Sequence, residues 1–179
     1  MTGRRTNPIG GDVNVIIASV PSRDAGLRAM DRLESAVADG VISVDDVALV
    51  YKTDTGRVKI QQTGDATGGR GALKGGALGV LVGLFSAPLV PAVAVGAGLG
   101  ALVGRARNRG ISDRLIKQAG QAIQSAKAVV FVLADTASTI AIMLMIEDAI
   151  AEGATVEYEV LPAEAQDFLR EAIELSSAA

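Results

Sequence analysis

The stretch from Gly71 to Gly104, GALKGGALGVLVGLFSAPLVPAVAVGAGLGALVG, most constrains what this chain can fold into. Its glycines recur every four residues in two rows: Gly71, Gly75, Gly79 and Gly83, then Gly96, Gly100 and Gly104, with Ala92 extending the second row. On a helix, this spacing places each row along one narrow stripe. Glycine costs a helix about 1 kcal/mol relative to alanine. Regular glycine rows therefore indicate helices that approach one another closely, backbone against backbone.

Pro88 and Pro91 interrupt the stretch near its middle and predict two helical arms joined in a hairpin. The apolar filling between the glycines argues against a linker, because flexible linkers are polar and rich in serine. An unbroken helix from Gly75 to Gly104 would be about 45 Å long and would cross a bilayer. Hairpin arms of about 13 to 17 residues reach only roughly 20–25 Å, short of the ~30 Å hydrocarbon core. We expect the hairpin either to dip into a membrane or to pack against copies of itself.

Basic residues mark both ends of this segment. They are Arg70 and Lys74 before the first row, and Arg105, Arg107 and Arg109 after the second. No acid occurs between Ala66 and Gly110, although the whole chain has a formal net charge of −3. Two basic ends on one side suit the cytoplasmic face and anionic headgroups. The acidic stretch from Glu147 to Glu174 of a neighbouring subunit is an alternative partner for these cations.

The sequence around the insert alternates short β-branched runs with amphipathic helical patterns. The predicted strands are Val13–Val20, Val47–Tyr51, Arg57–Gln61, Ala128–Ala134 and Val156–Val160, and the predicted helices run from Ser22 or Asp24 to Gly40, Ile111–Ala126, Thr136–Ala151 and Pro162–Leu175. Thr53 to Gly56, TDTG, predicts the turn of a β-hairpin.

Two helix ends resemble each other in sequence. Leu33–Gly40 is LESAVADG, and Ile146–Gly153 is IEDAIAEG, with one Glu, two Ala and the Gly identical. Each copy follows a strand and precedes another, which indicates two βαβ units. We therefore predict an α+β fold, a ferredoxin-like sandwich with its helices on one face and the hairpin inserted. The predicted organisation is a flexible tail (1–12), a first half-domain (13–65), the insert (66–110) and a second half-domain (111–179).

The composition argues against catalysis. The chain has no His and no Cys, which removes the commonest general base, the commonest metal ligand and any thiolate. Aromatic residues make up 3% of the chain and its net charge is negative, so we expect no nucleic-acid binding. The glycines near Gly69 lack the strand–loop–helix context of a phosphate-binding loop. Asp45–Asp46 and Glu147–Asp148 are neighbours in sequence that point apart, which favours solvated surface. We predict no catalytic residue, no cofactor, no metal and no small-molecule substrate.

The order of these features resembles one known family. The relevant segments are KTDTGRVKIQQ, GRGALKGGALGVLVGLF, ISDRLIKQAGQAI, AKAVVFVLAD and PAEAQDFLREAI. Together they resemble the bacterial domain-of-unknown-function family 1269, whose members are often labelled predicted membrane proteins. The resemblance extends from about Val13 to Leu175. It implies an α/β domain with a glycine-rich hairpin and membrane association, and it implies no activity.

The sequence thus favours a non-enzymatic protein at the cytoplasmic face of the membrane, in which the glycine-zipper hairpin drives homo-oligomerisation and membrane insertion. The alternative is a soluble, cytoplasmic structural protein that forms a homo-oligomeric ring, shell or filament through the hairpin. An enzyme or ligand-binding domain is the least favoured class.

Overall fold

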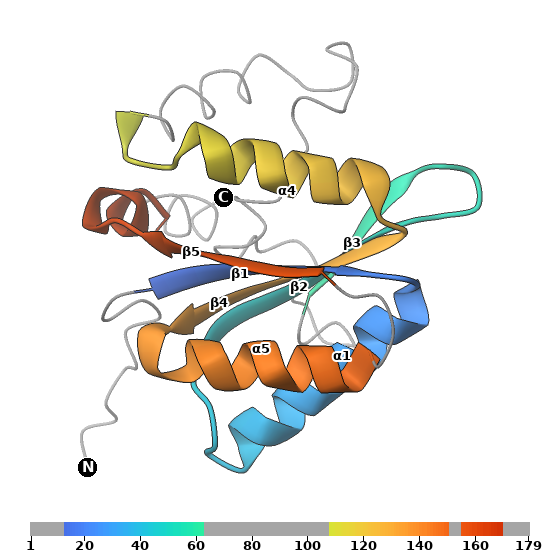
Figure 1. Ribbon diagram of the computed structural model, residues 1–179, viewed down its shortest axis with the longest axis horizontal. Coiled ribbons are helices and arrows are strands. Elements are labelled where there is room, and N and C mark those ends of the chain that lie inside the picture. Colours follow the sequence, from blue (N-terminus) through green and yellow to red (C-terminus); the bar gives the residue numbers. More distant parts are fainter. Residues whose placement is uncertain (1–12, 63–107, 151–154, 170–179) are drawn as a thin grey trace, which may run out of the picture.

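A computed structural model describes residues 13–62, 108–150 and 155–169 (Figure 1). Its elements are β1 (Val13–Val20), α1 (Arg23–Ala38), β2 (Val44–Lys52), β3 (Val58–Gln62), α4 (Asp113–Ser125), β4 (Ala128–Asp135), α5 (Thr136–Ile150), β5 (Thr155–Leu161) and a short helix over 163–169. The five strands form one antiparallel sheet in the order β3-β2-β4-β1-β5. The described chain is therefore a mixed α+β structure with one sheet and four helices.

The strand β4 lies at the centre of the sheet because its sequence can be buried on both faces. Its residues AVVFVLAD are fully buried except for the last, and it pairs with β1 on one side and β2 on the other. A strand flanked and covered in this way needs apolar side chains at every position, and β-branched residues suit the extended backbone. The continuous apolar run in the sequence predicted this strand, and the prediction is confirmed.

The helices α1 and α5 cover one face of the sheet. From α1, Met30 and Leu33 point into the core, and from α5, Ile142 and Ile146 do the same. They pack on alternate residues of the central strands, such as Ile16 of β1. The two helices also contact each other, and Arg32 of α1 forms an exposed ion pair with Asp148 of α5.

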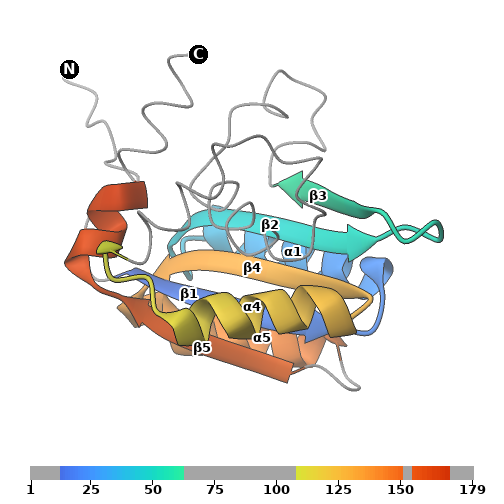
Figure 2. The same ribbon diagram turned by 90° about the horizontal axis from the view of Figure 1, so that it is seen from above.

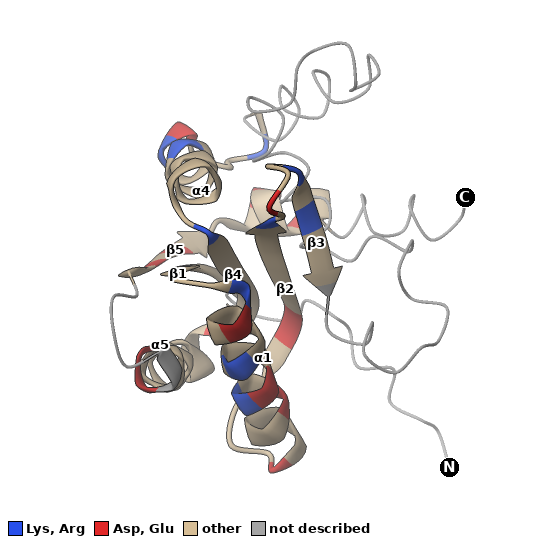
Figure 3. Ribbon diagram, turned by 90° about the vertical axis from the view of Figure 1, so that its right-hand side faces the viewer, with Lys and Arg blue, Asp and Glu red and all other residues tan. Residues whose placement is uncertain are grey.

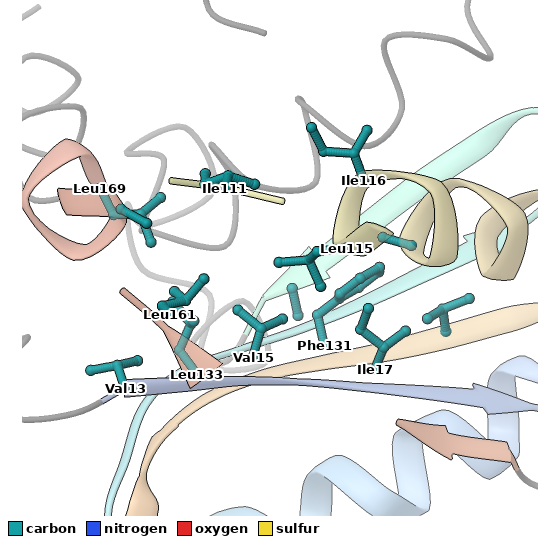
Figure 4. Close-up of a cluster of buried hydrophobic side chains, with 14 of the residues drawn as sticks. Val13, Val15, Ile17, Ile111, Leu115, Ile116, Phe131, Leu133, Leu161 and Leu169 are labelled. Atoms are coloured by element: carbon teal, nitrogen blue, oxygen red, sulfur yellow. The ribbon is translucent and has the colours of Figure 1, made fainter. Parts of the chain in front are cut away.

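The opposite face is covered by α4 and by the helix over 163–169. Figure 4 shows Leu115 and Ile116 of α4 above Val15, Ile17 and Phe131 of the sheet. Leu169 closes the same core at the other end. The sequence predicted that the helices cover one face of the sheet. Only α1 and α5 share that face, whereas α4 and the helix over 163–169 cover the other. The apolar stripe of α4 predicted a buried side correctly, but a stripe does not specify which face of a sheet it meets.

The two βαβ units interlock. In the first unit β1-α1-β2, the two strands are parallel and β4 lies between them, whereas in the second unit β4-α5-β5, the strand between is β1. The sequence repeat falls at matching places, because Leu33 of α1 and Ile146 of α5 are both buried on the sheet. The second copy of the repeat ends in residues 151–153, which lie outside the described part of the chain.

The local signals at the helix and hairpin ends match the structure. Ser22 caps α1, and its Oγ accepts a hydrogen bond from the backbone N–H of Ala25. Gly40 follows with φ of 70°, a conformation that glycine adopts without strain. In the β2–β3 hairpin, the backbone N–H of Thr53 donates to Arg57 and Gly56 has φ of 76°. The strand β2 starts three residues earlier than predicted, at Val44, because a bulge near Asp45 lengthens it.

Candidate functional site

The chain leaves the sheet for the insert at one end, which we call the insert end of the sheet. It comprises the starts of β1 and β2 and the ends of β4 and β5, and β3 runs toward it but ends opposite Ala48 of β2. The strand register defines it, since Val13 lies opposite both Asp135 and Leu161, and Val44 lies opposite Ala134. The described chain stops at Gln62, the last residue of β3, and resumes at residue 108.

The chain returns at the same end of the sheet. Gly110 has φ of 86°, and a Cβ atom placed on it would lie 2.8 Å from Cγ of Pro162, the residue after β5. The next residue, Ile111, is buried in the same core as Leu161. The chain thus returns beside β5, whereas the described chain leaves from the opposite edge at Gln62, which lies opposite Ala48 in the middle of β2. Figure 2 shows β3 and β5 at opposite edges, with β2, β4 and β1 between them.

The described residues include one member of the predicted basic set. Arg109 lies in the turn before α4 and is exposed to solvent. The other predicted site residues lie outside the described part of the chain: Gly71, Gly75, Gly79, Gly83, Gly96, Gly100, Gly104, Pro88, Pro91, Arg70, Lys74, Arg105 and Arg107. Within the described ranges, no helix is both long enough and apolar enough to cross a membrane.

Three acidic residues from two strands gather at the insert end of the sheet. Asp45 and Asp46 come from the bulged start of β2, which is coloured as acidic in Figure 3, and Asp135 ends β4. Partial burial raises the pKa of the Asp45 carboxyl group to about 6, and the negative charges of Asp135 and then Asp46 act in the same direction. The sequence interpretation of Asp45–Asp46 as solvated surface missed Asp135, which only the sheet brings near. Among the described residues, no three acidic side chains are arranged to hold a metal ion.

A buried polar link fixes the start of α5 at this end. Asn14 of β1 is 1% exposed and Thr139 of α5 is 3% exposed, and Asn14 Nδ2 donates to Thr139 Oγ1 at 2.7 Å. The Thr139 hydroxyl donates to the backbone carbonyl of Asp135, whose carboxylate accepts the backbone N–H of Ser138. Asn14 Oδ1 has no hydrogen-bond partner among the described residues. The one sequence feature that could have indicated this link is the polar Asn14 within the otherwise apolar run VNVII of β1.

A groove lies at the other end of the sheet, beside α4. It has a volume of about 640 Å³ and is lined by Gln118 and Gln121 of α4, Lys127, Glu157 of β5, and apolar residues of β1. The side-chain amides of Gln118 and Gln121, together with the charged groups of Lys127 and Glu157, can hydrogen-bond a small polar molecule. Ser19, Ser125 and Thr155 also line the groove, and among the described residues none of their hydroxyl groups is hydrogen-bonded to Lys127 or Glu157 as a nucleophile to its base.

Residues 72–174 match the family model described as Protein of unknown function (DUF1269). No curated protein and no solved structure matches the chain. The matched span includes most of the insert, α4, β4, α5 and β5. Since it covers more than half of the sequence, the chain belongs to the DUF1269 family.

Proposed function

We propose that this chain is a non-enzymatic, self-assembling protein whose glycine-zipper hairpin mediates oligomerisation and inserts into the cytoplasmic face of a membrane. One observation carries the hairpin geometry. The strand β4, which follows the insert in sequence, lies between β1 and β2, which precede it. Both flanks of the insert therefore belong to one sheet and must lie on the same side of any bilayer.

This topology argues against a single crossing and supports the proposal of a segment that enters and returns on one side. Because β3 runs toward the end of the sheet where Gly110 lies, we propose that the two predicted arms share a base at that end. The basic residues Arg70, Lys74, Arg105, Arg107 and Arg109 would gather at this base, where they favour anionic headgroups by about 1 kcal/mol each. The exposed position of Arg109 fits that role.

We also infer that the two interlocked βαβ units form a ferredoxin-like sandwich. The strand order β2-β4-β1-β5 with α1 and α5 on one face supports this assignment. The ferredoxin-like sandwich does not include β3, α4 or the helix over 163–169. Of these added elements, β3 precedes the insert and α4 follows it. The soluble scaffold thus presents the insert from elements that are not needed for the sandwich itself.

The test is fractionation of the full chain without detergent, followed by flotation with anionic and neutral vesicles. We expect membrane recovery that resists salt washing, and flotation that favours anionic vesicles. Gly79→Leu with Gly100→Leu should disrupt the assembly, whereas the off-row changes Ala77→Leu with Ala94→Leu should preserve it.

Each outcome bears on a separate part of the proposal. Recovery of the protein as a large soluble particle that does not float with vesicles would overturn membrane insertion. It would support a soluble ring, shell or filament. An assembly that survives the two glycine substitutions would overturn the role of the glycine rows. Loss of assembly at high salt would show that the basic residues contact an acidic partner, such as the stretch from Glu147 to Glu174 of a neighbouring subunit.

A further inference from the structure

The strand β5 is an open edge of the sheet with an apolar face. Within the described residues it pairs only with β1, so its outer backbone groups lack strand partners there. Tyr158 is 56% exposed and Val160 is 53% exposed, although both lie opposite residues of β1 that are buried. An edge strand with exposed apolar side chains is a template for pairing with another chain.

The apolar surface continues onto α5. Tyr158 and Val160 lie on the same face of the sheet as α5, because they pair with Ile16 and Asn14 of that face. The helix contacts β5, and its Ile140 and Leu144 are 71% and 60% exposed. These two residues are one turn apart on the side away from the sheet, where a solvated helix normally carries polar residues.

The sequence of β5 is symmetric about Tyr158. Val156, Glu157, Tyr158, Glu159 and Val160 read VEYEV in both directions. In an antiparallel pair about a two-fold axis at Tyr158, each residue faces its own type: Tyr158 faces Tyr158, and Val156 faces Val160 of the other copy. The valines and tyrosines of both copies then form one apolar strip on the α5 face. We propose that the outer edge of β5 is an interface between two copies of this chain, paired antiparallel about Tyr158.

The charges around this edge favour a second copy over a lipid surface. The described residues of α5 and β5 carry acidic side chains and no basic ones, which opposes an anionic membrane. The pairing places Glu157 opposite Glu159 of the other copy, and such like charges weaken a strand pair. Lys127 lines the same groove as Glu157, although no ion pair joins these two side chains among the described residues. We expect this lysine to offset part of the repulsion between the paired carboxylates.

The proposal is independent of the insert, because its residues lie in the sheet and not in the glycine rows. The native chain contains no cysteine, so any disulfide bond in a single-cysteine variant must join the introduced cysteines of two copies. The test of the proposal uses this property. Directly opposite residues of an antiparallel pair have Cα atoms about 4.5–5.5 Å apart, within the range that a disulfide bridges. Single-cysteine variants of the full chain are purified reduced and oxidised with copper phenanthroline.

We expect Tyr158→Cys to form a disulfide-linked dimer at least tenfold faster than Ile60→Cys, a matched exposed position on the opposite edge strand β3. Val156→Cys and Val160→Cys should each cross-link poorly alone, and an equimolar mixture of the two should cross-link efficiently. This register-dependent result would establish the pairing about Tyr158. Equal rates at Tyr158 and Ile60, or no gain in the mixture, would overturn it.

The same measurement in the background of Gly79→Leu and Gly100→Leu separates this interface from assembly through the insert. We expect the cross-link at Tyr158 to persist in that background. Its loss there would show that contact at β5 follows from hairpin assembly and is not an interface of its own. Lys127→Gln, which removes the compensating cation, should slow cross-linking about threefold or more, in line with the cost of like-charged cross-strand pairs.

Discussion

Asn14 of β1 donates from its side-chain amide to the hydroxyl of Thr139 in α5 at 2.7 Å, across 125 positions of sequence. Both side chains are buried, and the same hydroxyl donates to the carbonyl of Asp135. The contact joins the two halves of the chain on either side of the insert. It therefore fixes where α5 begins relative to the sheet.

Thr139→Val tests how much the hydrogen bond between Asn14 and Thr139 contributes to the free energy of unfolding. Valine has nearly the shape of threonine but leaves the Asn14 amide without this acceptor, and an unpaired buried polar group costs about 1–3 kcal/mol. We expect the free energy of unfolding to fall by that amount in urea titrations. Thr155→Val, at an exposed position of β5, is the control and should change stability by less than about 0.5 kcal/mol. Equal stabilities of the two variants would contradict the assigned role of Thr139.

Gly26 allows α1 to lie close to β2. A Cβ atom at this position would be 2.4 Å from Cδ1 of Leu49, whose side chain is fully buried. Gly26→Ala gains about 1 kcal/mol of helix propensity, but overpacking a core costs typically about 1–3 kcal/mol. We expect a net loss of stability of about 1 kcal/mol in thermal or urea unfolding.

The Leu49→Ala background provides the control for Gly26, because it removes the atom that the new methyl group would meet. In that background Gly26→Ala should be neutral or stabilising. If the substitution costs the same in both backgrounds, contact with Leu49 is not the reason for the glycine.

Gly110→Ala tests the point where the chain returns from the insert. Gly110 and Gly40 both have positive φ, at 86° and 70°, so alanine is strained by about 1–2 kcal/mol at either site. Only at Gly110 would the added Cβ meet a neighbour, Pro162. We expect Gly110→Ala to destabilise the protein by about 1 kcal/mol more than Gly40→Ala, measured by urea denaturation. A smaller effect at Gly110 would show that Pro162 moves aside at little cost.

Asp45 predicts a pH dependence of stability. Its folded-state pKa of about 6 lies above the ordinary value of 3.8, so the folded protein holds this proton more tightly than the unfolded chain. The associated stability is present below about pH 4 and is lost as the pH rises through about 6. Asp45→Asn should remove this loss and leave the variant more stable at pH 8 by on the order of 1 kcal/mol, reduced by solvent screening of an exposed residue.

The measurement for Asp45 is the difference in unfolding free energy between variant and wild type from pH 4.5 to pH 8. That difference should grow with pH and level off above about pH 7. Thr155→Val, which removes no titratable group, is the control and should give a difference that does not change over this range. A constant difference for Asp45→Asn as well would contradict the raised pKa.

Much of the fold was predictable because it depends on local patterns. The unbroken apolar run of β4, the cap at Ser22 and the glycine after α1 each leave a short signal in the sequence. No sequence signal indicated which face of the sheet α4 covers, since its apolar stripe at Leu115 and Ile123 would fit either face. The approach of Asp135 to Asp45 was also hidden, because it depends on strand pairing between distant segments. The predicted glycine and proline sites lie outside the described residues and stay predictions.

The strand pairing on either side of the insert has a consequence for the length of the insert. Strand register is set by pairs such as Val13 with Asp135 and Val50 with Ile60, and none of these pairs depends on the number of residues between Gln62 and Gly110. A longer or shorter insert would leave every strand pair in place. The length of the segment between Gln62 and Gly110 can therefore change without altering the register of the sheet that carries it.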